Sequence, residues 1–445
     1  MPYNYLQLSG LLAQLAERLD DPGNLYWSQS ELLLYVQETF RTWQAISGYW
    51  RGRMTFNTLP GITYYDLPSQ LGSIIPYTLK DTDLNTLLAY HLIETPPTGG
   101  TWTGTDMFSI DDLTRALERR RNQFLVETGM VVTRSLFNWP APPTPSFGLA
   151  DTTIDVRRAA WVSAAGKYST LWRSDEFGAS TFSPGWNNSP QDPPSAYSIA
   201  AEPPVTLALL PPPLNPGQVE LFSVLAGAPL NPAAGVLLGI PDNLAWIVKW
   251  GALADLLSKA GQAEDLQRAG YCEQRWREGI NIARIHTSIV QAAINGVISE
   301  TNALESLDAY SPGWENTAPG LPTSVALSAW NMLIVAGPPD AGPYSLQLDV
   351  VQNAPVPVLL TDYIQVGREE LDVLIDYMEH LAFFKMGGDD FLGSTSLYDR
   401  MLRMGGIHNE RLKASVNYVE PMADRAVREE ILTPRRVPIE QGQGA

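Results

Sequence analysis

Four histidines are the residues best suited to acid–base or metal chemistry, but their spacing forms no known site. His91, His286, His380 and His408 are far apart, and none has a partner at metal-motif spacing such as HExxH. His380 lies in an apolar helical pattern typical of a buried, hydrogen-bonded histidine, whereas His408 in GGIHNER is expected at the surface. The sequence also lacks the GxSxG, GxxxxGK(S/T) and GxGxxG motifs. We therefore expect no metal, no cofactor and no enzymatic activity.

Carboxylates are the other possible source of chemistry. Asp389 and Asp390 are adjacent in GGDD, but neighbouring side chains diverge, so the pair favours helix capping over cation binding. Two carboxylates can also cleave a glycosidic bond, but the fold brings such pairs together, and sequence spacing does not reveal them. A carbohydrate- or peptidoglycan-cleaving enzyme is therefore an alternative from a different functional class, with no residues selected for it.

A basic stripe and the tryptophans could serve binding. Arg115, Arg119, Arg120 and Arg121 fall on an expected helix at 109–128. Such a stripe can contact an acidic partner or phosphate, although a solvated face with salt bridges is the commoner case. The thirteen tryptophans are spread along the chain, which favours roles in cores and subunit interfaces over a sugar-stacking cluster.

Composition restricts the class of protein. The 445 residues suffice for two or three domains, and the formal charge of −18 argues against a dedicated nucleic-acid binder. Cys272 is the single cysteine, which fits synthesis in a reducing compartment. The N-terminus lacks the pattern of a signal peptide, and no apolar run is long enough to span a bilayer. We therefore expect a soluble protein without membrane association.

A repeated tryptophan motif divides the chain. SPGWNN at 183–188 recurs as SPGWEN at 311–316, and such self-similarity indicates duplicated structural units. Trp186 and Trp314 are both set in SPGW turns, so we predict that they are structural pegs that close each module.

The repeat continues downstream of each tryptophan. An expected strand-turn-strand at 207–229 has a counterpart at 333–355, and the same offset of 126 residues places Gly279 on Gly405. A divergent third copy would include the strand-turn-strand FNTLPGITYYDL at 56–67. Each full module is expected to hold a β-hairpin followed by two antiparallel helices.

The predicted fold is therefore α+β but mainly helical, with antiparallel helix pairs and small β-hairpin modules duplicated in tandem. Apolar periodicity and capping signals place its helices. They fall at 3–20, 30–46, 80–94, 109–128, 242–261, 263–294, 368–388 and 394–416. The predicted organisation is an N-terminal helical domain with a β-hairpin (1–137), a Pro-rich connector (138–150), a first module (151–298), a second module (299–416) and an extended C-terminal tail (417–445).

The order of these elements resembles the neck proteins of tailed bacteriophages. The segments that carry the likeness, all within residues 25–285, are SELLLYVQETFRTWQ, VRRAAWV, DPPSAY, LPPPLNPGQVEL and GIPDNLAWIVKWGALADLLSKAG. They resemble the head-to-tail adaptor, or connector, proteins of short-tailed phages. The further module at 300–415 departs from a small adaptor, which leaves a collar, nozzle or fibre-attachment ring as an alternative position in the virion.

The resemblance implies a structural virion protein made in the host cytoplasm. Its partners would be the portal protein, the nozzle, hub or fibre proteins of the tail, and copies of itself in a ring of twelve subunits. Genomic DNA would pass through the lumen without sequence-specific binding. The C-terminal tail would dock into the portal, and its candidate contact residues are Arg425, Arg428, Arg435, Arg436, Val437 and Ile439.

Overall fold

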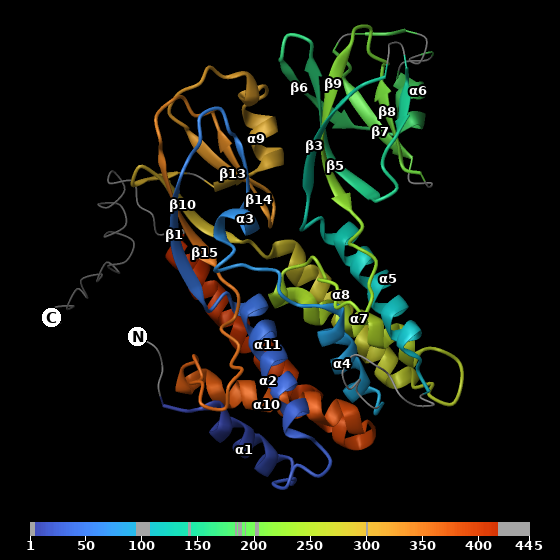
Figure 1. Cartoon of the computed structure of the whole chain (residues 1–445), viewed down its shortest axis with the longest axis vertical. Helices are drawn as coiled ribbons and strands as arrows, with labels where there is room; N and C mark the ends of the chain where they lie inside the picture. Colours follow the sequence, from blue (N-terminus) through green and yellow to red (C-terminus); the bar gives the residue numbers. More distant parts are fainter. Residues whose placement is uncertain are drawn as a thin grey trace, which may run out of the picture.

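The computed structural model describes residues 5–94, 107–140, 144–182, 185, 189–191, 193–200, 204–299 and 301–416. Two β-rich lobes lie side by side above a layer of helices (Figure 1). Helix and strand account for 41% and 24% of the described residues, and three sheets hold the fifteen strands found among them. The prediction of a mainly helical fold with small hairpins is therefore wrong, because long-range strand pairing builds much larger sheets than the sequence indicated.

One lobe and its helices form a continuous unit, residues 80–285, which we call the inner module. Its helices α4, α5, α7 and α8 pack together beneath a curled sheet of seven strands in the order β3-β9-β5-β6-β7-β8-β4. All neighbouring strands are antiparallel except β6 and β7. The elements are α4 (Asp81–His91), α5 (Ile110–Thr128), β3 (Thr133–Asn138), β4 (Ser146–Gly148), β5 (Thr153–Ser163), β6 (Tyr168–Arg173), α6 (Glu176–Phe182), β7 (Ala196–Ala200), β8 (Thr206–Leu210), β9 (Gly217–Leu225), η2 (Asp242–Leu244), α7 (Ala245–Leu257) and α8 (Leu266–Ile285).

The second unit, which we call the outer module, is assembled from both ends of the chain, residues 7–66 and 289–416. Strand β1 pairs with β15 and β2 pairs with β14, and each pair joins residues more than 260 positions apart in the sequence. The short helix α3 (Leu67–Leu71) follows β2. The elements are α1 (Leu8–Arg18), α2 (Gln29–Ser47), β1 (Arg51–Asn57), β2 (Tyr64–Asp66), β10 (Ile289–Ile294), β11 (Val297–Ser299), β12 (Thr301–Ala303), α9 (Leu304–Tyr310), η3 (Trp314–Asn316), β13 (Ser324–Ala329), β14 (Met332–Ala336), β15 (Ser345–Val351), α10 (Arg368–Met386) and α11 (Gly388–Val416).

The two modules have the same topology. The outer strands form two sheets, β1-β15-β10-β11 and β12-β13-β14-β2, which together repeat the strand order of the inner sheet with β11 and β12 in the place of β6. Even the one parallel pair recurs, as β6·β7 in one module and β12·β13 in the other. Isolated bridges join Lys80 to Leu237 and Gln7 to Tyr363, so the start of α4 and the start of α1 are tied at matching positions.

The duplication is therefore nested. The whole inner module is inserted between β2 and β10 of the outer module, at the place of the short inner connection from β4 to β5. Exposed loops tolerate such insertions when the inserted unit has neighbouring ends. The predicted tandem arrangement is therefore wrong. The predicted hairpins are wrong as well, because β8 does not pair with β9 and β14 does not pair with β15. The expected helix at 263–294 also ends early, because its last part is β10.

Matching caps fix the first long helix of each module. α2 and α5 are both 19 residues long, and the side chains of Ser28 and Ser109 accept backbone hydrogen bonds at their N-termini. Both helices end at a left-handed glycine, Gly48 or Gly129, a conformation that glycine adopts without steric penalty. A serine cap contributes about 1 kcal/mol to helix stability. Local sequence thus sets the same helix length in both modules.

The hydrophobic core is shared between the modules. One cluster of buried side chains runs from α1 to α11 and includes residues of both helical layers, whereas a second, smaller cluster fills only the curl of the inner sheet. The helical layers are thus held together by apolar burial.

Candidate functional site

The contact between the two modules holds several of the buried charged groups and is the candidate functional site. Helix α2 of the outer module packs against η2, α7 and α8 of the inner module, and α4 of the inner module packs against α2 and α10 (Figure 1). The contact is heterologous, meaning that the two modules use different surfaces. The inner counterpart of α2 is α5, and within the described residues its main contacts are all with inner elements, α4, α7, α8 and β9.

A buried ion pair joins the modules at the centre of the helical layer. Lys249 on α7 is fully buried, and its Nζ lies 2.6 and 2.7 Å from the two carboxylate oxygens of Glu38 on α2. It also donates to Nε2 of His91 on α4 at 3.2 Å. Burial lowers the pKa of Lys249 to about 8, although the carboxylate of Glu38 opposes that shift. Burial and the adjacent ammonium lower the pKa of His91 well below its usual value, so this ring is neutral and can accept the hydrogen bond.

An aromatic cage holds a second buried cation. Arg275 on α8 is fully buried, and its guanidinium lies 3.2 Å from the ring centroid of Tyr398 on α11. The rings of Trp246 and Trp250 lie 5.4 and 5.2 Å away. Its Nη2 donates to the hydroxyl of Tyr377 at 2.8 Å. Cation–π contacts of this kind stabilise a desolvated guanidinium, so the cage ties α8 to α10 and α11 of the outer module.

A hydrogen-bonded histidine completes the helical contact. Nδ1 of His380 lies 2.8 Å from Oγ of Ser394, which itself donates to the carbonyl of Phe391 at 2.7 Å. Nδ1 must therefore be the donor, and Nε2 accepts from the hydroxyl of Tyr271 at 2.6 Å. Burial lowers the pKa of His380 to about 3. A histidine that stays neutral and is bonded at both nitrogens stabilises the structure and cannot exchange a proton near neutral pH.

The sheets meet through a second charged network. Arg158 on β5 binds Asp308 on α9 at 2.7 Å and Glu315 on η3 at 2.6 Å, both in the outer module. It also contacts Glu220 of its own sheet at 3.1 Å. Burial alone would lower the pKa of Arg158, but the hydrogen bond to Asp308 and the charge of Glu315 raise it, so the guanidinium is permanently charged.

Trp314 belongs to this sheet contact. Its Nε1 donates to Asp308 at 3.0 Å, and its buried ring meets Tyr64 edge-on. The Tyr64 hydroxyl lies 3.1 Å from Glu315, and burial is the main cause that raises the pKa of both groups. These acidic and basic groups are bonded to each other across the interface. The arrangement therefore orients the two sheets.

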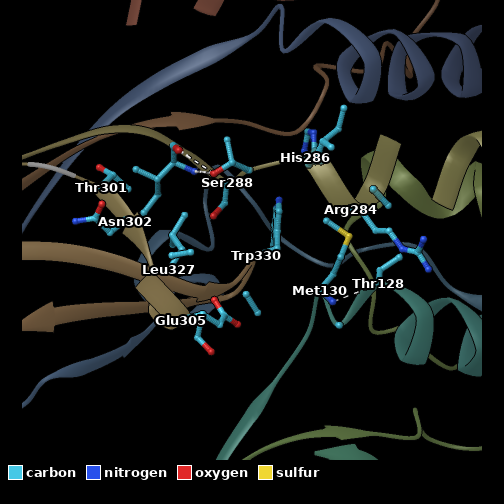
Figure 2. Close-up of a pocket in the computed structure, with 18 of the residues that line it drawn as sticks. Thr128, Met130, Arg284, His286, Ser288, Thr301, Asn302, Glu305, Leu327 and Trp330 are labelled. Atoms are coloured by element: carbon cyan, nitrogen blue, oxygen red, sulfur yellow. Dashed lines mark hydrogen bonds between the residues drawn. The ribbon is translucent and has the colours of Figure 1, made fainter. Parts of the chain in front are cut away.

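A cavity of about 480 Å³ lies where the chain passes from the inner to the outer module (Figure 2). Its walls come from the ends of α5 and α8, the start of β10, β12 and the turn between β13 and β14. Ser288 and Trp330 are buried there, and their Oγ and Nε1 atoms have no hydrogen-bond partner among the described residues. Burial lowers the pKa of the adjacent His286 to about 4, so the cavity contains no histidine that would titrate near neutral pH.

The residues selected from the sequence have different outcomes in the structure, and several of them lie outside its described part. Trp186 and the tail residues Arg425, Arg428, Arg435, Arg436, Val437 and Ile439 lie outside the described residues. Asp389 and Asp390 are exposed in the first turn of α11. His408, expected at the surface, is instead partly buried against Trp43 and lies 3.2 Å from Glu370.

The basic stripe divides into two parts. Arg120 and Arg121 are buried: the first binds Asp255 at 2.6 Å, and the second donates to the carbonyl of Ala228 at 2.8 Å. Arg115 is exposed, and Arg119 keeps 66% of its side-chain area exposed while contacting Asp255. Half of the stripe is thus structural, and half faces outward.

Sequence reasoning missed the residues that join the modules. Glu38, Lys249, Arg275 and Arg158 were not selected, although Lys249 interrupts the apolar run AWIVKWGALADLL. A lysine inside an otherwise apolar helix requires a buried partner, and that signal was available. The identity of the partner was not, because Glu38 is more than 200 residues away in the sequence.

Comparisons with known proteins leave the family of this chain open. No protein-family model matches the sequence, and no curated protein is significantly similar to it. In the part of the chain that the structure describes, no group of three or more His, Cys, Asp or Glu side chains is placed to hold a metal ion. None of the helices described is both long and apolar enough to cross a membrane.

Proposed function

We propose that this chain is a structural virion protein of a tailed bacteriophage, a head-to-tail adaptor that forms a ring between the portal and the tail. The observation that carries the proposal is the heterologous side-by-side contact of two equivalent modules within one chain. Contacts of this kind, repeated from copy to copy, close into rings when the rotation fits. The likeness to adaptor proteins in the order of sequence elements supports the same role.

The buried ion pairs agree with a structural role in this proposal. Charged groups such as Lys249 and Arg158 are used to fix the relative orientation of the modules, and well-bonded polar networks of this kind favour one geometry. The formal charge of −18 suits a conduit for DNA, because an anionic wall does not retain phosphate.

The proposal assigns portal docking to residues 417–445, with Arg435 and Arg436 pairing with acidic groups of the portal. Deletion of 417–445 is expected to abolish co-sedimentation with purified portal rings and to leave the far-UV circular dichroism and unfolding transition unchanged. The matched variant carries Arg435→Glu and Arg436→Glu in the full chain and should bind at least tenfold more weakly. Retained binding after the deletion would contradict the docking assignment. A ring that forms without portal contact would instead place the chain in a collar, nozzle or fibre-attachment ring.

A further inference from the structure

Each module has one surface that is covered by the other module of the same chain. The inner module covers α2 and is itself covered at α4, α7 and α8. The equivalent surfaces that remain are α5 on the inner module and the α1–α10 side of the outer module. The exposed fraction of side chains at equivalent positions of the two modules shows which of these surfaces are covered and which are open.

On the first surface, α2 and α5 bury the same apolar side but differ on the other. Glu38 of α2 keeps 3% of its side-chain area exposed, whereas its counterpart Arg119 on α5 keeps 66%. Ala45 is 5% exposed and its counterpart Val126 is 38% exposed. The α5 surface therefore has the position of a covered interface but lies open, with Arg115 and Arg119 upon it.

The second surface shows the same contrast. Trp246 of α7 is 3% exposed, while the residue 126 positions later, Asp372 of α10, has a side chain that is 73% exposed. His91 of α4 is fully buried, and Arg18 occupies the corresponding end of α1, where it binds Asp376 at 2.7 Å. The aromatic surface of the inner module thus corresponds to a polar surface on the outer module, where Asp372 is exposed and Asp376 is buried beside Arg18.

The charges on the two open surfaces are complementary. In the covered contact, acidic Glu38 from the α2 surface meets basic Lys249 on the receiving surface. On the open pair, the α5 surface is basic and the receiving α10 surface is acidic. The counterpart of Lys249 is the buried Ile375, and the exposed carboxylate of this surface is Asp372, one helical turn earlier. Arg119 and Asp372 then bring opposite charges together when the contact between modules is repeated between chains.

We propose that copies of this chain assemble head to tail, with the α5 surface of one copy on the α1–α10 surface of the next. The proposal rests on the proposed function only for the site of assembly, a ring beneath the portal. A second copy is the occupant because the chain already contains this contact once. The open surfaces are polar, so the association is salt-sensitive, and a template would promote ring closure.

Cysteine cross-linking tests this geometry. Chains carrying Arg119→Cys and Asp372→Cys together, with the buried Cys272 retained, are treated with a short bismaleimide at high protein concentration and low salt. We expect a ladder of covalent dimers, trimers and larger species. The control carries Arg119→Cys with Lys167→Cys, since Lys167 is exposed on the inner sheet away from both surfaces, and should give no ladder.

Single variants distinguish head-to-tail from twofold contact. Arg119→Cys chains alone should give no cross-linked dimer, and mixing them with Asp372→Cys chains should give dimers only. A dimer from Arg119→Cys alone, or no ladder from the double variant, would overturn the proposal.

Charge reversal provides a second readout. In sedimentation velocity, Arg119→Asp is expected to weaken self-association about tenfold or more, and adding Asp372→Arg should restore it. Failure of the second change to restore association would overturn the pairing. A ladder from a chain that does not bind portal rings would contradict the proposed function and support the head-to-tail contact. Portal binding without a ladder would contradict the head-to-tail contact and support the proposed function.

Discussion

The inner and outer modules share one topology but differ in the side chains and the exposure of an equivalent surface. The receiving surface of the inner module is built from Trp246, Trp250 and His91, and it is permanently covered. The receiving surface of the outer module carries Asp372, Asp376 and Arg18 at the corresponding positions, and the side chain of Asp372 is 73% exposed. The structure thus contains one buried contact between the modules, and the proposed contact between chains would be a more polar one suited to reversible assembly.

The sheets differ in a similar way. The inner sheet is continuous through β6 and encloses its own apolar cluster, whereas the outer strands form two sheets whose buried residues join the helical core. The outer module therefore depends on its helices and on the inner module for burial. The inner sheet carries a core of its own.

The largest predicted effect comes from breaking the central ion pair. Glu38→Ala leaves Lys249 buried without its carboxylate, so we expect the free energy of unfolding to fall by about 3–5 kcal/mol. Arg119→Ala, at the equivalent but exposed position, should change it by no more than about 0.5 kcal/mol. Urea unfolding monitored by tryptophan fluorescence gives both values. Equal effects at the two positions would contradict the contrast between the covered and open surfaces.

His380 of the outer module should contribute to the acid sensitivity of the fold, beside the buried His91 of the inner module. The folded pKa of His380, about 3, lies below the usual value of 6.5, so only the unfolded chain takes up this proton between those values. This contribution to stability is therefore complete above pH 6.5 and declines as pH falls. His380→Gln should remove about 2–3 kcal/mol of the loss between pH 6.5 and 4.5. The inner counterpart Ala254 cannot titrate, and Ala254→Ser is the control. An unchanged pH slope in His380→Gln would refute the assignment.

Two equivalent glycines should respond alike, since both lie where helices of one module touch. A Cβ at Gly279 would lie 2.7 Å from Ile247, and a Cβ at Gly405 would overlap with Ile46. Alanine at either position should lower stability by about 1–3 kcal/mol. Gly270 and Gly406 lie in the same helices with open space around them, so alanine there should stabilise by up to about 1 kcal/mol. Thermal unfolding of the four variants tests this; destabilisation at only one of the tight positions would show that helix packing differs between modules.

The sequence was informative about local structure and about the offset of 126 residues that relates the repeated segments. The offset that aligns Gly279 with Gly405 matches equivalent helices, and the capping residues Ser28 and Ser109 begin equivalent helices. The strand partners were not predictable, because a proline-rich turn between two strands is typical of a hairpin, whereas β8 and β9 pair elsewhere. The insertion point was hidden for the same reason: pairing of β1 with β15 joins the two ends of the chain.

The candidate site was less predictable than the fold. Lys249 was recognisable as an unusual residue in its helix, but its partner Glu38 is fixed only by tertiary packing. Arg119 and Arg120 are neighbours in the same stripe, yet one is exposed and the other buried, because a helix turns adjacent side chains to different sides.

The most direct test of the proposed ring is to mix the purified chain with portal rings from the same virion and image the product by electron cryo-microscopy. We predict a ring of side-by-side chains beneath the portal, with α5 of each chain on α10 of its neighbour. Chains that remain unattached, or rings that form alone and ignore the portal, would contradict the adaptor assignment.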